Sequence, residues 1–360
     1  MLGLLIAFIG SLVSSLVIIR CRHLHAHLTN DSDLSGPQKF HKIIVPRIGG
    51  LGIAIGVSMA IFYRLESSPN PTFELMILIC AIPAFGSGLI EDLTKKVSVK
   101  TRLFFTGISG LLAVNYLGAS ITKLDIPGLD WLLTFPTIGT LFTIFCVMGL
   151  SNAYNIIDGF HGLASMVAMI TLLAIAYMNF LMGDLLYLSL SFIMIGACLG
   201  FFIINYPRGL IFLGDGGSYL IGFWIAILSI LLIARNPNVS PWFALLINAY
   251  PIVETLFTIY RRKVQQRKNL GEPDGIHFHS LIYRRVLQAY NTEAPHTFSA
   301  NAKTSPYLWI LSGLPNIAGL LWWQSTAGLI LCTVLFVILY IWLYRSIVHF
   351  KTPKWLHIFE

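Results

Sequence analysis

Carboxylates recur beside long apolar segments in three stretches that are far apart along this chain. Glu91 and Asp92 stand in GLIEDLTKK, Asp158 in NAYNIIDGFHGL and Asp215 in FLGDGGSYLIGF. A carboxylate next to an apolar segment is costly unless it is paired or binds a cation. Oxygen ligands are those that Mg²⁺ prefers, and Mg²⁺ commonly links one or two carboxylates to a substrate phosphate. These positions therefore favour metal-assisted phosphate chemistry.

Imidazoles, cations and glycines accompany these acids. His277 and His279 stand two residues apart in DGIHFHSLIYRR. Such groups neutralise or hydrogen-bond phosphate oxygens, whereas two histidines without a cysteine only weakly indicate zinc. Glycines flank Asp215 at the start of an apolar segment, and we expect them to let the backbone at a helix N-terminus approach an anion closely. The cations near the same segment ends are Lys42, Arg47, Lys95 and Lys96.

Each of these stretches also has a plain structural interpretation. Asp215 could simply cap a helix, and EDLTKK could be a solvated helix end with internal ion pairs. Glu254, inside an apolar segment, is a functional candidate, but a structural pairing with Arg261, about two helical turns away, is an equal alternative. NAYNIIDGFHGL contains more polar groups than a turn between helices requires, and it therefore favours a binding or catalytic role.

The elements that carry these groups are long and apolar. The chain has 360 residues, of which 56% are hydrophobic and 11% charged, whereas an ordinary soluble domain is about one quarter charged. Apolar segments of roughly 17–25 residues can cross a bilayer as helices. We therefore predict an all-α integral membrane protein, a single domain over residues 1–360. The eleven predicted spans are 2–19, 48–65, 73–90, 103–121, 132–150, 164–182, 185–204, 217–234, 241–260, 306–323 and 326–344.

The distribution of lysine and arginine predicts the orientation, because cytoplasmic loops are enriched in these residues. With the N-terminus outside and the C-terminus cytoplasmic, the 24 lysines and arginines all fall on the inner side except Arg64, Lys123 and Arg235. The net charge of +8 therefore belongs mostly to membrane-tethered inner loops, which argues against nucleic-acid binding. The predicted active-site loops on this inner face are 38–50, 91–102, 151–163, 205–218 and 261–305.

Five motifs, in order along the chain, resemble those of the polyprenyl-phosphate N-acetylhexosamine-1-phosphate transferases, the bacterial glycosyltransferase family 4. They are KFHKIIVPRIGG, GLIEDLTKK, NAYNIIDGFHGLA, FLGDGGSYLIGF and DGIHFHSLIYRR. The resemblance covers roughly residues 38–285. This family includes the enzymes that initiate O-antigen, enterobacterial common antigen and teichoic-acid linkage synthesis. It also includes the phospho-MurNAc-pentapeptide transferase of peptidoglycan synthesis.

The resemblance implies a reaction and a location. The enzyme would transfer N-acetylhexosamine 1-phosphate from a UDP-sugar to polyprenyl (undecaprenyl) phosphate, giving UMP and a polyprenyl-diphosphate-linked sugar. That product would begin a cell-surface polysaccharide such as the O-antigen of lipopolysaccharide. The implied location is the bacterial cytoplasmic (inner) membrane, with many spans and an active site that faces the cytoplasm. UDP-N-acetylhexosamine, polyprenyl phosphate and membrane lipids are the expected partners, and the resemblance permits a homodimer.

The resemblance also implies roles for the acids. Asp215 is expected to bind Mg²⁺, with Mn²⁺ as the alternative metal, and the metal to bridge the pyrophosphate of the donor. Asp92 is expected to orient or deprotonate the lipid phosphate, with Glu91 assisting. A covalent phosphosugar intermediate on Asp92 is the mechanistic alternative. Asp158, the fourth expected catalytic acid, holds nucleotide or sugar.

Substrate-binding roles follow for the polar groups around these acids. The asparagines are expected to hold nucleotide or sugar, the histidines to contact sugar or phosphate oxygens, and the lysines to steer the anionic substrates. The residues concerned are Asn152, Asn155, His161, His277, His279, Lys42 and Lys95.

The chain also departs from the family pattern. Glu91 stands where the family usually has aspartate, and His161 where it usually has aspartate or asparagine. The histidine stretch lacks the HHxE-like ending of the peptidoglycan enzyme, which disfavours that branch and leaves phospho-MurNAc-pentapeptide transferase as the alternative function. A membrane transporter or an inactive scaffold are the alternatives of another class. Transport is disfavoured because transporters more often place their charged groups at the middle of the membrane.

Overall fold

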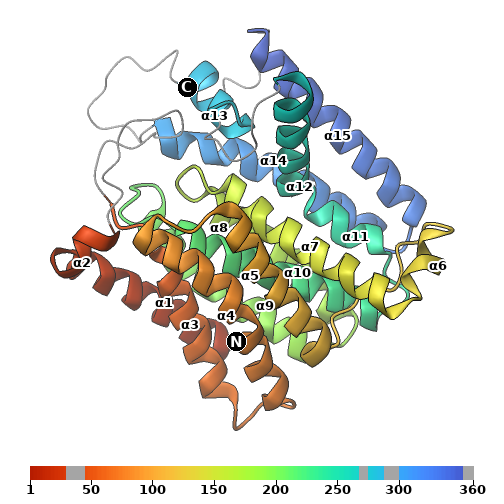
Figure 1. Cartoon of the computed structure of the whole chain (residues 1–360), viewed down its shortest axis with the longest axis horizontal. Helices are drawn as coiled ribbons and strands as arrows, with labels where there is room; N and C mark the ends of the chain where they lie inside the picture. Colours follow the sequence, from red (N-terminus) through yellow and green to blue (C-terminus); the bar gives the residue numbers. More distant parts are fainter. Residues whose placement is uncertain (30–44, 267–274, 288–299, 352–360) are drawn as a thin grey trace.

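The computed structural model describes residues 1–29, 45–266, 275–287 and 300–351, and within these ranges the regular elements are helices, without a β-strand (Figure 1). In Figure 1 the first helices (red and orange) and the last (blue) lie on opposite sides of the green ones. The elements are α1 (Leu2–Arg20), α2 (Arg22–Thr29), α3 (Gly49–Arg64), α4 (Pro71–Thr94), α5 (Val99–Leu117), α6 (Leu129–Leu133), α7 (Pro136–Ile157), α8 (Leu163–Leu181), α9 (Leu185–Asn205), α10 (Gly214–Arg235), α11 (Pro241–Ile247), α12 (Ala249–Tyr260), the π-helix η1 (Arg261–Gln265), α13 (Phe278–Ile282), the π-helix η2 (Tyr283–Leu287), α14 (Ala300–Trp322) and α15 (Thr326–Val348).

Helices lie at each predicted span, but fewer than eleven meet the requirements of a membrane crossing. Within the described ranges, seven are long and apolar enough, namely α1, α4, α7, α8, α9, α10 and α15. The pair α11 and α12, bent by 75°, makes an eighth if it is one broken span. α3 is shorter, with 16 residues, and α5 and α14 fall outside this set. The all-helical fold with its candidate spans agrees with an integral membrane protein, while the count of eleven and the orientation stay predictions.

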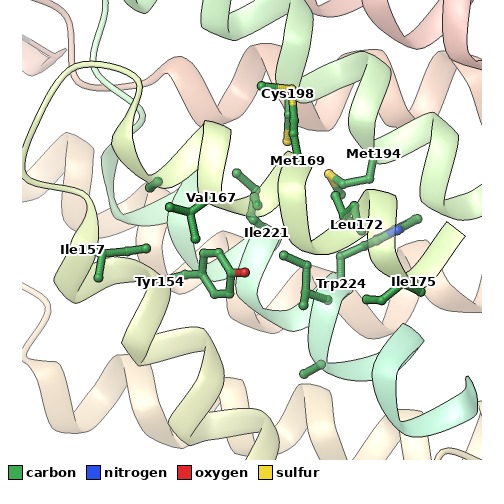
Figure 2. Packing of buried hydrophobic residues seen from close by; sticks show 14 of the residues in the cluster. Tyr154, Ile157, Val167, Met169, Leu172, Ile175, Met194, Cys198, Ile221 and Trp224 are labelled. Atoms are coloured by element: carbon green, nitrogen blue, oxygen red, sulfur yellow. The ribbon is translucent and has the colours of Figure 1, made fainter. Parts of the chain in front are cut away.

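Helix α10 forms the centre of the bundle. Its residues from Gly214 to Leu232 are all buried, and it packs against α3, α4, α5, α7, α8 and α9. A helix that is apolar on every side is either buried in protein or faces lipid, and α10 is of the first kind. Figure 2 shows part of this packing, where the labelled side chains come from α7, α8, α9 and α10. The central helix thus holds Asp215, in its first turn, among the surrounding helices at one end of the bundle.

Glycines allow three helices to approach α10 at backbone distance. A Cβ added at Gly88 of α4 would lie 2.6 Å from the backbone at Asp215 and Gly216. One added at Gly217 would lie 2.7 Å from the Cα of Gly50 in α3, and α7 makes a similar contact further along α10. In membrane proteins, helices associate closely where small residues meet, because lipid tails supply no hydrophobic drive for association. Gly216 and Gly217, next to Asp215, therefore serve helix packing, a role that the sequence did not predict for them.

A proline breaks the helix that contains the ninth predicted span. Pro251 has no N–H, so the carbonyl of Ile247, one turn earlier, lacks its helical partner. Thr171 Oγ1 of α8 and Asn316 Nδ2 of α14 donate to that carbonyl, at 3.3 and 3.0 Å. Buried backbone at a helix break requires such partners. The bend of 75° between α11 and α12 is therefore held by side chains from two other helices.

The three cations predicted to lie outside are each paired with a carboxylate at the end of the bundle opposite Asp215. Arg64 contacts Glu74 at 2.9 Å and Lys123 contacts Asp125 at 2.7 Å. The third, Arg235, contacts a carboxylate at the start of α9, Asp184, at 3.4 Å. These exceptions in the charge distribution thus have local partners, whereas the other end of the bundle carries the predicted site.

The contact between α4 and α10 can be tested with a matched pair of glycines. Gly88→Ala forces a Cβ against the α10 backbone, and overpacking of this kind costs about 1–3 kcal/mol of stability. Gly86→Ala is the control on the same helix, because a Cβ there meets nothing within 4 Å. We expect a lower thermal unfolding midpoint in detergent for Gly88→Ala only. Equal midpoints for the two variants would contradict the close packing of α4 on α10.

Candidate active site

The buried carboxylate of Asp92 caps the N-terminus of α10. Its Oδ1 accepts from the backbone N–H of Asp215 and its Oδ2 from that of Gly216, both at 2.8 Å. Only 2% of Asp92 is exposed. The first N–H groups of a helix have no partner inside the helix, and the helix dipole favours a negative charge there. Asp92, a residue of α4, therefore acts as the N-terminal cap of α10. The alternative interpretation of EDLTKK as a solvated helix end is wrong for this residue.

A glycine with a left-handed backbone completes this cap. Gly214 has a φ of 76°, a conformation that other residues rarely adopt. A Cβ at this position would lie 2.6 Å from Asp92 Oδ2. Only glycine therefore fits between the carboxylate of Asp92 and the first turn of α10.

Two arginines and an amide surround the carboxylate of Asp215. Arg47 Nη2 donates to Oδ1 at 3.0 Å, and Asn155 Nδ2 donates to the same oxygen at 2.8 Å. Arg102 Nη1 donates to Oδ2. Only 5% of Asp215 is exposed, and a buried charge is tolerated when it is paired and hydrogen-bonded in this way. The segment before α3 and the helices α5, α7 and α10 therefore meet at one carboxylate.

Arg47 also links Asp215 to the other two predicted aspartates. Its Nε lies 3.5 Å from Asp92 Oδ1. Asp158 follows the last residue of α7 and is partly exposed. Burial raises the pKa of Asp158 to about 7, and the nearby charge of Arg47 acts in the opposite direction. The structure thus brings Asp92 and Asp215 to one guanidinium group, with Asp158 near enough to be affected by its charge.

A second layer of polar contacts holds the two asparagines. Asn155 Nδ2 also donates to Ser218 Oγ at 3.0 Å, and Tyr219 OH donates to Asn152 Oδ1 at 3.1 Å. The guanidinium of Arg102 lies over the Tyr219 ring, 5.7 Å from its centroid, a cation–π contact. Both asparagines therefore face the first turns of α10.

Glu91 and Lys95 lie at the C-terminal end of α4. Glu91 Oε2 accepts from the backbone N–H of Val97 at 2.6 Å and so fastens the turn between α4 and α5. Lys95 is exposed at the end of α4, with a left-handed φ of 55°. Lys42 lies outside the described residues. Among the contacts described above, the cations that pair with Asp92 and Asp215 are Arg47 and Arg102.

The histidine stretch packs on the link between α7 and α8. His277 and His279 stack with ring centroids 5.1 Å apart, and Phe160 meets His279 edge-on at 5.3 Å. A Cβ at Gly159 would lie 2.9 Å from His279 Nε2. The two histidines therefore join the site next to Asp158, which directly precedes this glycine.

His161 fastens the far end of the same link. Its backbone N–H donates to Asn301 Oδ1 at 2.9 Å, and Ser305 Oγ donates to its carbonyl at 2.6 Å. Its ring stacks on Phe212, with centroids 5.7 Å apart. Because Phe212 lies just before α10, these contacts tie the link to both α10 and α14.

Arg102 was missed by sequence reasoning, and Arg47 was seen only as one cation among several. Both belong to predicted active-site loops, which is the signal that could have found them. Hydropathy and spacing do not reveal which of several cations reaches a particular carboxylate. That choice depends on how α3 and α5 pack against α10.

The oxygen-rich donor set fits a magnesium ion with few protein ligands. Among the described residues, no three Asp, Glu, His or Cys side chains lie together as a complete metal cage. Mg²⁺ usually takes one or two carboxylates together with water and substrate phosphates. Asp215 and Asp158 would be such carboxylates. The contacts given above for the described residues include no cysteine, whose thiolate would favour a softer metal.

Comparisons with known proteins point to one enzyme family. Residues 74–233 match Glycosyl transferase family 4. The chain is 30% identical over 283 residues, 78% of each chain, to a probable undecaprenyl-phosphate N-acetylglucosaminyl 1-phosphate transferase of Bacillus subtilis (strain 168). It is 32% identical over 296 residues, 78% of this chain and 84% of the relative, to a phospho-N-acetylmuramoyl-pentapeptide-transferase of Streptococcus thermophilus (strain CNRZ 1066). A decaprenyl-phosphate N-acetylglucosaminephosphotransferase of Mycobacterium leprae (strain TN) is 28% identical over 286 residues, 69% of this chain and 70% of the relative.

The cap on α10 can be tested by replacing one carboxylate with an amide. Asp92→Asn leaves one oxygen to accept from two N–H groups, and an unsatisfied buried N–H costs about 1–3 kcal/mol. Glu91→Gln is the matched control, because its remaining oxygen can still accept from Val97. Thermal unfolding in detergent should show a lower midpoint for Asp92→Asn alone. A midpoint equal to that of the native protein would refute the capping role of Asp92.

Proposed function

Since this chain belongs to glycosyl transferase family 4, we propose that it transfers N-acetylglucosamine 1-phosphate from a UDP-sugar to a polyprenyl phosphate and releases UMP. The names of the Bacillus subtilis and Mycobacterium leprae relatives support this donor sugar and a polyprenyl acceptor. The observation that carries the proposal is the contact of Arg47 with both Asp92 and Asp215, beside Asp158, whose pKa is affected by the charge of the same arginine. The undecaprenyl carrier and the use of the product to initiate an O-antigen are the finer parts of the proposal.

The reaction exchanges one phosphoanhydride bond for another. An oxygen of the lipid phosphate attacks the phosphorus that carries the sugar, a new P–O bond forms, and the bond to UMP breaks. UMP leaves with the bonding electron pair, and no proton has to be removed from a dianionic lipid phosphate. Alignment and charge neutralisation therefore matter more than a general base.

The contacts of Asp92 support a positioning role. Both of its oxygens accept hydrogen bonds from α10, so Asp92 orients the first turn that carries Asp215. Arg47 and Arg102 are the groups that bind phosphate oxygens, since guanidinium matches their geometry. Asn152 and Asn155 hold nucleotide or sugar beside them, and His277 and His279 lie at the Asp158 side of the site, where they contact phosphate.

Mg²⁺ is the cofactor that we propose, with Asp215 as its ligand and Asp158 beside it. The metal supplies positive charge to the pyrophosphate of the donor. The arginines on Asp215 hold this carboxylate at the start of α10. His161 contributes by fixing the link that carries Asp158, and Glu91 by fixing the turn behind Asp92.

We also propose the bacterial cytoplasmic membrane as the location, with eleven spans, the N-terminus outside and the site facing the cytoplasm. Asp215 lies at the end of the bundle predicted to be rich in cations, and the cations at the other end are paired with carboxylates. UDP-sugars are cytoplasmic, so this orientation gives the donor direct access. The homodimer stays a prediction.

Phospho-MurNAc-pentapeptide transfer is the second candidate. The Streptococcus thermophilus relative, which carries that name, is 32% identical to the chain. Both reactions release UMP and use a polyprenyl phosphate, so only the donor separates them. The transporter alternative is less well supported, because the acids meet at one end of α10.

The central test is UMP release by the purified protein in detergent. With undecaprenyl phosphate, Mg²⁺ and UDP-GlcNAc, we expect turnover that Asp215→Asn lowers roughly 100-fold or more, the scale of losing one electrostatic contact at a reacting centre. Asp184→Asn is the control, since it makes the same change at the opposite end of the bundle. Turnover only with UDP-MurNAc-pentapeptide would favour the second candidate. No UMP with any donor from folded protein would reject the transferase.

Metal removal tests the cofactor. Because two aspartates with phosphate ligands form a site of few protein groups, we expect EDTA to remove the ion and to abolish UMP release. Added Mg²⁺ should restore the rate, and Mn²⁺ should replace it in part. Undiminished turnover in excess EDTA would rule out a dissociable divalent metal.

A further inference from the structure

Glu254 is a buried carboxylate that the proposed reaction does not use. It lies in α12, within the ninth predicted span, and only 1% of it is exposed. Its Oε1 accepts from His277 Nδ1 at 3.0 Å and from the backbone N–H of Phe278 at 3.2 Å. Its Oε2 accepts from Tyr340 OH of α15 at 2.7 Å. The sequence left a pairing with Arg261 open, but the structure gives these three partners to Glu254.

These contacts determine the protonation of the His277 ring. An ionised carboxylate can only accept hydrogen bonds, so the nitrogen that faces it must carry the proton. Thr258 Oγ1 lies 3.2 Å from the same Nδ1. Nδ1 is therefore engaged in contacts with Glu254 and Thr258, both residues of α12. Only Nε2 of the ring can then act on a substrate. In this arrangement a carboxylate accepts from one ring N–H and thereby fixes the orientation of a histidine whose other nitrogen is functional.

The break between α11 and α12 brings Glu254 to this position. Pro251 stands one turn before Glu254, and the helix changes direction by 75° at the break. Thr171 and Asn316 hold the carbonyl that the proline leaves without a partner. The position of Glu254 thus depends on contacts from α8 and α14 as well as on its own helix.

His277 connects Glu254 to the candidate active site. The ring of His277 stacks on His279, and His279 packs against Gly159 and Phe160, directly after Asp158. A path of direct contacts therefore runs from the broken helix to one of the acids around Arg47. Glu254 is linked to this part of the site through His277, so His277 is the group through which Glu254 can affect the reaction.

We propose that Glu254 is a positioning residue that fixes the orientation and the tautomer of His277, so that Nε2 of this ring is presented to substrate phosphate. This proposal rests on the proposed function and goes beyond it by assigning the residue behind the histidine stretch. Glu254 touches no substrate in this role. It acts only through His277.

A double-mutant cycle tests the dependence on His277. Glu254→Met removes the hydrogen-bond acceptor while keeping a side chain of similar volume. It should lower kcat for UMP release about 10–100-fold, the range seen when the partner that orients a functional histidine is removed. The KM for UDP-sugar should change little. Glu254→Gln keeps an oxygen for Nδ1 and an amide for Tyr340, and should restore most of the rate. In a His277→Ala background, Glu254→Met should cause no further loss. Equal losses in both backgrounds would overturn the proposal.

Tyr340→Phe is the matched control for stability. It removes one hydrogen bond of Glu254 without touching His277, so it should lower the unfolding midpoint while leaving kcat nearly unchanged. If Glu254→Met does not fold, the ¹⁵N measurement of the His277 tautomer in the native protein decides the matter. Parallel losses of kcat in Glu254→Gln and Tyr340→Phe would mean that Glu254 only supports the fold.

The tautomer can be measured without turnover. Histidine labelled with ¹⁵N should show His277 protonated at Nδ1 in its neutral form, and Glu254→Met should shift it towards the Nε2-protonated form. An Nε2-protonated ring in an otherwise active protein would overturn this proposal alone. A protein with the expected tautomer but no UMP release with any donor would overturn the proposed function, and with it the catalytic role of Glu254.

Discussion

The hydrogen bonds between Asp92 and the first turn of α10 are the interaction on which the rest of the site depends. A helix that is buried on all sides must begin somewhere, and its first N–H groups cannot be left without partners in an apolar interior. Asp92 supplies both acceptors from α4, across 123 residues of sequence. This contact holds the first turn of α10, and with it Asp215, against α4.

The other features of the site follow from the charge brought there. Two aspartates inside an apolar protein require cations, and Arg47 and Arg102 supply them from the two elements that flank α4. Glycines at the crossings of α3 and α4 with α10 allow these elements to come close enough. The same guanidinium groups suit the phosphates of a nucleotide sugar, so the charge that stabilises the resting protein also prepares it for an anionic substrate.

The C-terminal helices also contain backbone groups that need partners in an apolar interior, but here side chains from other helices supply them. Pro251 breaks the ninth predicted span, and side chains of α8 and α14 satisfy the backbone at the break. The break brings Glu254 to His277, and the histidine stretch closes over the link that carries Asp158. Both halves of the site thus place a buried carboxylate next to a residue that we propose to act on substrate or metal, Asp92 next to Asp215 and Glu254 next to His277.

The sequence by itself determined the helical membrane class, the positions of the long apolar helices and the stretches that meet at the site, because hydropathy and motif order are local properties of the chain. It also indicated Asp92, Asp158, Asp215 and the histidine pair. Only the tertiary structure decided which cations reach the acids, that the glycines around Asp215 pack helices, and that Glu254 holds His277 instead of pairing with Arg261. These are contacts between residues far apart in sequence, and they depend on how whole helices pack, which no local pattern records.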